Sequence, residues 1–190
     1  MPSAPQSLKI AFIGSHGVGK TTLCYGLAAR LKARDLSVEV VREVARRCPL
    51  AINQETGVAA QSWILHAQIA EELVAQERYP VVICDRSVLD NYVYMLLAAG
   101  RQSQLEPLLD AWLGSYGLLV RVPIVGVPSA DGVRATDPSF QRAVDERLTR
   151  ELSGRGLPTL ELDPNDREGW VDAVEDEAWR RLEPAQIQLL

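Results

Sequence analysis

One short segment restricts the fold of this chain more than any other feature, because it joins a strand-like run to a helix-like run through glycines at fixed spacing. Residues 14–21 read Gly-Ser-His-Gly-Val-Gly-Lys-Thr, which satisfies the pattern Gly-x-x-x-x-Gly-Lys-[Ser/Thr]. A branched apolar run precedes it at residues 8–13, and leucines at four-residue spacing follow it at Leu23, Leu27 and Leu31. This context predicts a buried strand, a phosphate-binding loop and a helix in that order.

Each residue type in the segment suits the binding of a nucleotide. Glycines let the backbone turn and approach phosphates closely, so that successive N–H groups and the positive end of the following helix face the anion. Lys20 would set a charge against the β- and γ-phosphates, and the Thr21 hydroxyl would ligate Mg²⁺. A tight turn alone explains the glycines but not Lys20 and Thr21 beside them. The predicted ATP-binding residues are Gly14, Ser15, His16, Gly17, Val18, Gly19, Lys20, Thr21 and Thr22.

The rest of the chain alternates short apolar runs with amphipathic runs, which is typical of an α/β fold with a parallel sheet. The 190 residues, of which 47% are hydrophobic, can form a core, so we expect a single domain over residues 1–190. Strands are predicted at residues 8–13, 38–42, 81–84, 118–123 and 159–162. Helices are predicted at residues 20–34, 57–79, 87–99, 104–115, 138–152 and 166–182.

A stretch without periodicity, residues 125–136, separates the fourth strand from the fifth helix and contains glycines and a proline. Asp137 and Pro138 then have the pattern of an N-cap and a first helical residue. Loops of this length in compact domains usually have a function. We therefore expect a lid segment around residues 126–154.

Charge and composition limit the classes of molecule that this protein is expected to bind. The formal net charge is −5, whereas a protein that binds long nucleic acid needs a basic surface, so long DNA or RNA is not expected as a partner. The sequence has neither a signal peptide nor an apolar run of membrane-spanning length, which favours a cytoplasmic protein with no membrane partner. A homodimer is compatible with the sequence. Cys24, Cys48 and Cys84 lack metal-ligand spacing, so we expect reduced cysteines in or near the core.

A second acidic feature follows the third predicted strand. The apolar run at residues 81–84 ends in Asp85, which is where proteins with a phosphate-binding loop keep the carboxylate that orients Mg²⁺, usually through water. Thr21 and Asp85 are therefore the predicted metal-binding residues. The structural alternative is that Asp85 only interacts with the dipole of the following helix.

Three further segments resemble a group of P-loop proteins. Residues 85–87, Asp-Arg-Ser, followed by Asp-Asn-Tyr at 90–92, resemble the turn after the third strand in deoxynucleoside kinases, in nicotinamide-riboside kinase domains and in related small AAA-type ATPases. Residues 42–46, Arg-Glu-Val-Ala-Arg, resemble their Glu-x-Ala-Arg pattern. Residues 131–134, Asp-Gly-Val-Arg, resemble the start of their lid helix.

The resemblance implies a fold and two cofactors. The fold is the three-layer sandwich of P-loop NTPases, with a five-stranded parallel sheet in the order 2-3-1-4-5, helices on both faces and a site at the carboxyl ends of the strands. The expected cofactors are ATP and Mg²⁺.

The resemblance also assigns roles to individual residues, and the roles of Glu43 and Arg86 each have a structural alternative. Glu43 matches a substrate ligand or base, because this position faces the mouth of the phosphate-binding loop in the kinases it resembles; the alternative is a solvated charge at a strand end. Arg86 matches a ligand of phosphate or substrate, but it could instead brace the strand end by pairing with a carboxylate. Arg134 matches an arginine finger that reaches the γ-phosphate. With Lys20 and Asp85, these residues complete the predicted catalytic set.

Three other polar or aromatic residues are weaker candidates. Ser87 and Asp90 have the spacing of a capping box, so Asp90 is more simply explained by helix capping than by catalysis. Trp63 and Tyr92 could stack on a flat ring, but aromatic residues at helical spacing more often belong to the core.

Three functions are consistent with these features. The first is a kinase for a small hydroxyl-bearing acceptor, with nicotinamide riboside or another nucleoside favoured over a nucleotide monophosphate. The second is a regulatory ATPase or nucleotide switch with no phosphorylated small-molecule product. The third, a polynucleotide end kinase, is disfavoured by the acidic net charge.

Overall fold

The computed structural model describes residues 7–52, 57–126 and 138–182. Its centre is a five-stranded sheet in the order β2-β3-β1-β4-β5, and every strand pair is parallel. The strands are β1 (Leu8–Ile13), β2 (Val38–Val41), β3 (Val81–Asp85), β4 (Leu118–Arg121) and β5 (Leu160–Glu161). The predicted fold class and strand order are confirmed.

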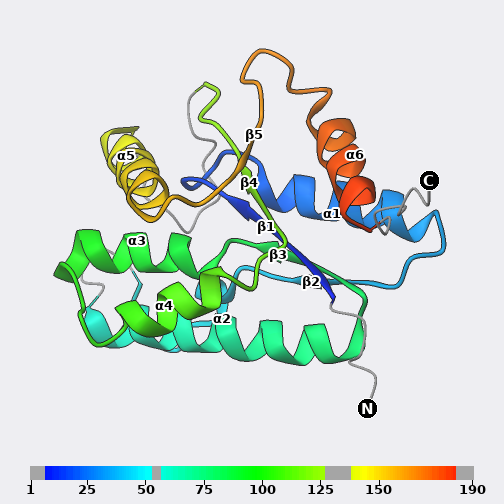
Figure 1. Cartoon of the computed structure of the whole chain (residues 1–190). Coiled ribbons are helices and arrows are strands. Elements are labelled where there is room, and N and C mark those ends of the chain that lie inside the picture. The colour runs from blue at the N-terminus through cyan, green and yellow to red at the C-terminus, as the bar shows by residue number, and fades with distance from the viewer. Residues whose placement is uncertain (1–6, 53–56, 127–137, 183–190) are drawn as a thin grey trace, which may run out of the picture.

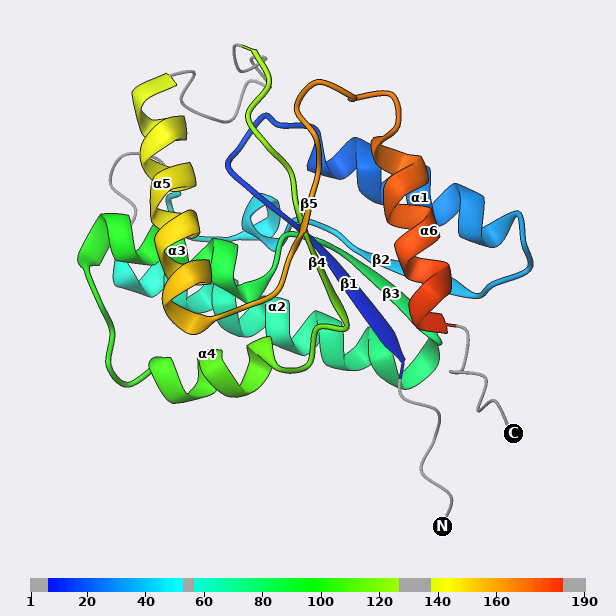
Figure 2. The same ribbon diagram turned by 45° about the horizontal axis from the view of Figure 1, so that its top comes forward.

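Helices cover both faces of this sheet, which gives three layers (Figures 1 and 2). Helices α1 and α6 lie on one face, and α2, α3, α4 and α5 lie on the other. Their bounds are α1 (Lys20–Lys32), α2 (Val58–Arg78), α3 (Val88–Ala99), α4 (Glu106–Leu113), α5 (Pro138–Arg155) and α6 (Trp170–Leu182), with a short 3₁₀ helix η1 (Val44–Arg47) after β2. Within the described ranges, no helix has both the length and the apolar character to cross a membrane.

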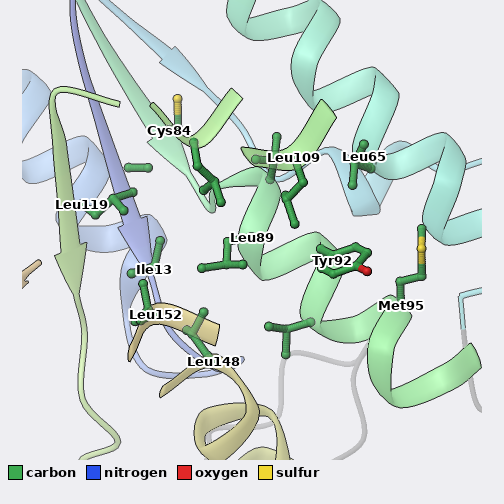
Figure 3. Packing of buried hydrophobic residues seen from close by; sticks show 14 of the residues in the cluster. Ile13, Leu65, Cys84, Leu89, Tyr92, Met95, Leu109, Leu119, Leu148 and Leu152 are labelled. Carbon is green, nitrogen blue, oxygen red and sulfur yellow. The ribbon is translucent and has the colours of Figure 1, made fainter. Parts of the chain in front are cut away.

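Each face of the sheet has its own apolar core, because neighbouring residues of a strand point to opposite faces. In β1, Ile10 and Phe12 pack on the side of α1 and α6, whereas Ala11 and Ile13 pack on the side of α2 to α5. Figure 3 shows Ile13 in the core on the side of α2 to α5, near Leu148 of α5. Burial on both faces explains why the central strands are apolar almost throughout.

Most differences from the predicted elements lie at their ends. Helix α6 begins at Trp170 rather than at residue 166, because residues 163–169 form turns in which the carboxylates of Asp163 and Asp166 accept the N–H groups of Asn165 and Gly169. The 3₁₀ helix η1 was not predicted, since four residues are too few to show a period. The predicted cap Asp137 lies outside the described residues.

The cysteines and Tyr92 are structural. All three cysteines are free thiols, as expected, with Cys24 and Cys84 buried. Burial raises the pKa of both buried thiols, which keeps them protonated. Tyr92 is fully buried and donates its hydroxyl hydrogen to Glu106, so it belongs to the core (Figure 3).

Candidate nucleotide and acceptor site

The loop between β1 and α1 has backbone conformations that explain its glycines. Gly17 and Gly19 have φ values of 74° and 97°, which side chains other than glycine rarely adopt. A Cβ atom on Gly14 would lie 2.6 Å from the carbonyl oxygen of Val122 in the segment after β4. The loop therefore packs against the neighbouring strand end and leads directly into the first turn of α1, whose N–H groups suit an anion.

Lys20 is buried within this loop. Its Nζ donates to the carbonyl oxygen of Gly14 at 2.9 Å and to that of Ser15, and only 5% of the residue is exposed. An ammonium held beside the first turn of α1 adds its charge to the positive end of the helix. This arrangement can bind phosphate oxygens.

Asp90 of α3 supports the start of the loop. Its Oδ1 accepts the N–H of Gly14 at 2.9 Å, and its Oδ2 accepts the N–H and the hydroxyl of Ser87, each at 2.9 Å. The predicted capping box is confirmed. Its carboxylate also fixes a glycine 76 residues earlier in the chain, so Asp90 both caps α3 and braces the phosphate-binding loop.

Thr21 and Asp85 lie together at the carboxyl ends of β1 and β3. The Thr21 hydroxyl donates to Oδ2 of Asp85 at 2.6 Å, and Asp85 is almost fully buried. A hydroxyl and a carboxylate are hard oxygen ligands, and Mg²⁺ typically uses one or two protein oxygens together with waters and phosphates. The pair therefore fits Mg²⁺.

Arg86 and Glu43 form a buried ion pair next to Asp85. The Nε of Arg86 donates to Oε1 of Glu43 at 2.9 Å, and Nε of Arg46 donates to Oε2 of Glu43 at 2.9 Å. The guanidinium also lies 5.0 Å from the centre of the Tyr94 ring. Its NH1 is buried and has no hydrogen-bond partner among the described residues. A buried donor without a partner suggests that a ligand completes this end of the site.

Electrostatics keep this guanidinium charged. Burial acts to lower the pKa of Arg86, but the nearby Tyr94, Glu43 and two aspartates outweigh it, so the pKa is raised on balance. Arg86 could bind phosphate or substrate, or it could pair with a carboxylate; the structure shows the pairing, with Glu43. Glu43 is 5% exposed, so the interpretation of Glu43 as a solvated strand-end charge is wrong.

The first turn of α5 contacts the phosphate-binding loop. The Phe140 ring stacks on His16 with centroids 5.9 Å apart, and Gln141 Nε2 donates to the carbonyl oxygen of His16 at 2.9 Å. His16 Nδ1 in turn lies 3.3 Å from the Tyr94 hydroxyl. The helix of the predicted lid thus begins against the loop. Arg134 and the Asp-Gly-Val-Arg segment lie outside the described residues.

Sequence reasoning missed one arginine beside the loop. The NH2 of Arg167 is 3.7 Å from the position that a Cβ of Gly19 would occupy. The turns at residues 163–169 present this residue, and the Trp170 indole, which donates to the carbonyl oxygen of Asp163 at 2.6 Å, anchors them. No motif marks Arg167, because only the parallel arrangement of β1 and β5 brings its segment to the loop.

Comparisons with solved structures agree with this architecture. A crystal structure of NadR protein in complex with NR has a TM-score of 0.69 and 24% identity, covering 90% of this chain and 51% of that chain. A crystal structure of NadR protein in complex with NAD and AMP-PNP has a TM-score of 0.65 and 22% identity, covering 90% of this chain and 49% of that chain. The structure of deoxyadenosine kinase from M. mycoides with bound dATP has a TM-score of 0.64 and 15% identity, covering 90% of this chain and 98% of that chain. The chain thus spans about half the length of the NadR chains, and likeness at these identities shows the fold alone.

Sequence comparison identifies a family. No curated protein matches the chain. A family described as AAA domain matches residues 9–169, from β1 to the residue before α6, and so includes the phosphate-binding loop, Asp85 and the Arg86–Glu43 pair. The chain therefore belongs to the AAA domain family.

Proposed function

We propose that this chain binds ATP with Mg²⁺ and transfers the γ-phosphoryl group to a hydroxyl of a small nucleoside-like molecule. Nicotinamide riboside or another nucleoside is the first choice of acceptor, and a nucleotide monophosphate is the second. The observation that carries the proposal is the buried Arg86–Glu43 pair directly after Asp85. A carboxylate and a guanidinium held at this position can orient an acceptor and stabilise a transferred phosphoryl group. The likeness of fold to NadR bound to NR and to deoxyadenosine kinase supports it.

The proposed roles follow from the contacts. Lys20 and the loop N–H groups hold the β- and γ-phosphates, while Thr21 and Asp85 hold Mg²⁺, which when bound neutralises phosphate charge. A carboxylate oxygen can accept two hydrogen bonds, so the arginine contacts of Glu43 are compatible with its also accepting one from the acceptor hydroxyl. Because phosphoryl transfer passes through a loose transition state, positioning and charge matter more than a strong base.

The lid and its arginine remain proposals from the sequence. We propose one domain over residues 1–190 with a lid around residues 126–154, in which Arg134 acts as the arginine finger. The contact of Phe140 and Gln141 with the phosphate-binding loop supports a link between this segment and the bound nucleotide.

A regulatory ATPase is the second candidate, favoured by membership of the AAA domain family. ATP consumption measured against nucleosides, nucleotides and short oligonucleotides separates the candidates. The proposed kinase requires consumption that rises with a nucleoside or nucleotide. Consumption that no acceptor changes would favour the regulatory ATPase, and consumption that rises only with oligonucleotides would favour an end kinase.

Glu43→Gln should lower acceptor-dependent kcat by about 10²-fold while leaving ATP affinity within about twofold, because the carboxylate holds the attacking hydroxyl and not the nucleotide. The measurement is steady-state turnover with and without acceptor, beside a nucleotide titration. Glu39→Gln, which neutralises a half-buried glutamate within β2 itself, is the matched control and should behave as wild type. Unaltered acceptor turnover in Glu43→Gln would remove Glu43 from the catalytic residues.

Asp85→Asn should raise the Mg²⁺ concentration needed for half-maximal activity by about 10- to 100-fold. An amide can still accept from Thr21 but no longer supplies a negative charge to the metal. Nucleotide binding measured with a chelator present should stay close to wild type. Asp35→Asn in the exposed turn after α1 is the control. A wild-type Mg²⁺ dependence in Asp85→Asn would leave Asp85 with a structural role only.

A further inference from the structure

A charged pair lies within the apolar layer between the sheet and α2. Lys9 of β1 and Glu72 of α2 are both fully buried, with 2.7 Å between Nζ and Oε2. Burying two charges is costly even when they are paired, and apolar replacements of such pairs are often neutral or stabilising. Stability is therefore a weak explanation for the pair, and its other contacts suggest a different role.

Glu72 is the centre of a hydrogen-bonded group. Its Oε2 accepts from Lys9 Nζ and from Trp112 Nε1, both at 2.7 Å, and its Oε1 accepts from Gln68 Nε2 and from the Tyr116 hydroxyl, both at 2.8 Å. The Lys9 ammonium also lies 4.2 Å and 4.3 Å from the ring centres of Trp112 and Tyr116. These five residues are called the Glu72 cluster below.

Two members of the cluster also contact the turn between β3 and α3. The Tyr116 hydroxyl accepts the N–H of Val88 at 3.0 Å while it donates to Glu72. Gln68 Nε2 lies 3.4 Å from the carbonyl oxygen of Arg86. Burial and the Glu72 charge raise the pKa of Tyr116, so its phenol stays protonated and keeps both hydrogen bonds. The cluster thus holds both ends of residues 86–88.

This turn needs such support because Arg86 has a φ of 92°. A residue other than glycine rarely adopts this conformation, and it persists only where the surrounding structure fixes it. The Arg86 N–H donates to the carbonyl oxygen of Phe12 at 3.2 Å, and its carbonyl faces Gln68. It is from this conformation that the guanidinium reaches Glu43.

We propose that the Glu72 cluster is a positioning centre for phosphoryl transfer. Glu72 orients Gln68 and Tyr116, these two hold the turn at residues 86–88, and the turn directs the Arg86 guanidinium to Glu43 and the acceptor. Glu72, Gln68 and Tyr116 act through Arg86, so they are positioning residues rather than catalytic ones, whereas Lys9 and Trp112 contact Glu72 but not the turn. This inference rests on the proposed function.

The test compares Tyr116→Phe with Trp112→Phe. Each variant removes one donor to Glu72, but only Tyr116 also binds the N–H of Val88. Tyr116→Phe should lower acceptor-dependent kcat about tenfold with KM for ATP within about twofold, and Trp112→Phe should leave kcat within about twofold. Amide hydrogen exchange at Arg86, Ser87 and Val88 should become about tenfold faster in Tyr116→Phe alone.

A structural role alone would instead lower the melting temperature of both variants and leave kcat per folded molecule and exchange at the turn unchanged, which would overturn the inference. A lower kcat in Tyr116→Phe without faster exchange would overturn it too, because the effect would not pass through the turn. Gln68→Leu, which removes the contact with the Arg86 carbonyl, is a second variant that should follow Tyr116→Phe.

The exchange measurement also separates this inference from the proposed function. If the wild-type protein phosphorylates no acceptor, the proposed function fails, and the role in phosphoryl transfer fails with it. Faster exchange in Tyr116→Phe alone would then still support the hold on residues 86–88. Equal exchange in both variants would overturn the inference whether or not the protein is a kinase.

Discussion

Lys20→Ala should reduce kcat/KM for ATP-dependent phosphoryl transfer by at least about 10³-fold. Lys20 is the charge that the loop itself supplies to the phosphates, and its ammonium already lies inside the loop, on the carbonyl oxygens of Gly14 and Ser15. An alanine leaves the backbone N–H groups in place but removes a buried cation that stabilises the negative charge of the transferred group.

The fold of Lys20→Ala should survive. The two loop carbonyls lose one donor, which costs about 1–2 kcal/mol, and the apolar cores on both faces of the sheet are untouched. Circular dichroism and thermal unfolding would be compared with Lys32→Ala, which removes an exposed lysine from the last turn of the same helix. Activity near wild type in a folded Lys20→Ala protein would contradict the assignment of the phosphate-binding loop.

Arg86→Lys should lower acceptor-dependent kcat by about 10²- to 10³-fold while ATP affinity changes little. The charge is kept, but an ammonium cannot make the planar contacts of a guanidinium that pairs with Glu43 and stacks near Tyr94. The loss should appear in kcat rather than KM, because Arg86 is proposed to stabilise the transferred phosphoryl group.

Arg30→Lys is the matched control for this substitution. Arg30 also forms ion pairs with carboxylates, the exposed Asp172 and the largely buried Glu175 of α6, but on the sheet face opposite α2 and α3. A lysine keeps the charge that faces both carboxylates, and neither pair involves Arg86 or Glu43, so this variant should retain wild-type turnover. Equal turnover in Arg86→Lys and Arg30→Lys would make Arg86 a brace of the strand end and nothing more.

The sequence predicts the fold and the nucleotide end of the site because both depend on local patterns. The phosphate-binding loop is one continuous segment whose residue types follow from the chemistry of phosphate, and burial on both faces makes β1, β3 and β4 visible as apolar runs. The strand order follows from the resemblance to kinases and not from periodicity, because the pattern of apolar residues does not indicate which strands are neighbours.

The parts that escaped prediction are contacts between distant segments. Asp90 has the spacing of a capping box, and nothing in the sequence indicates that its other oxygen holds Gly14. The sequence patterns at Glu43 and Arg86 lie 43 residues apart and do not indicate that the two side chains form one buried ion pair. Lys9 looks like an ordinary polar residue at the start of a strand, because Glu72 lies 63 residues away.

The most direct test of the central claim follows the γ-phosphoryl group of labelled ATP during incubation of the protein with Mg²⁺ and a panel of nucleosides that includes nicotinamide riboside. We predict that the label appears in a phosphorylated nucleoside and that Lys20→Ala abolishes this product. Label found only in inorganic phosphate, released at a rate that no acceptor changes, would contradict the account.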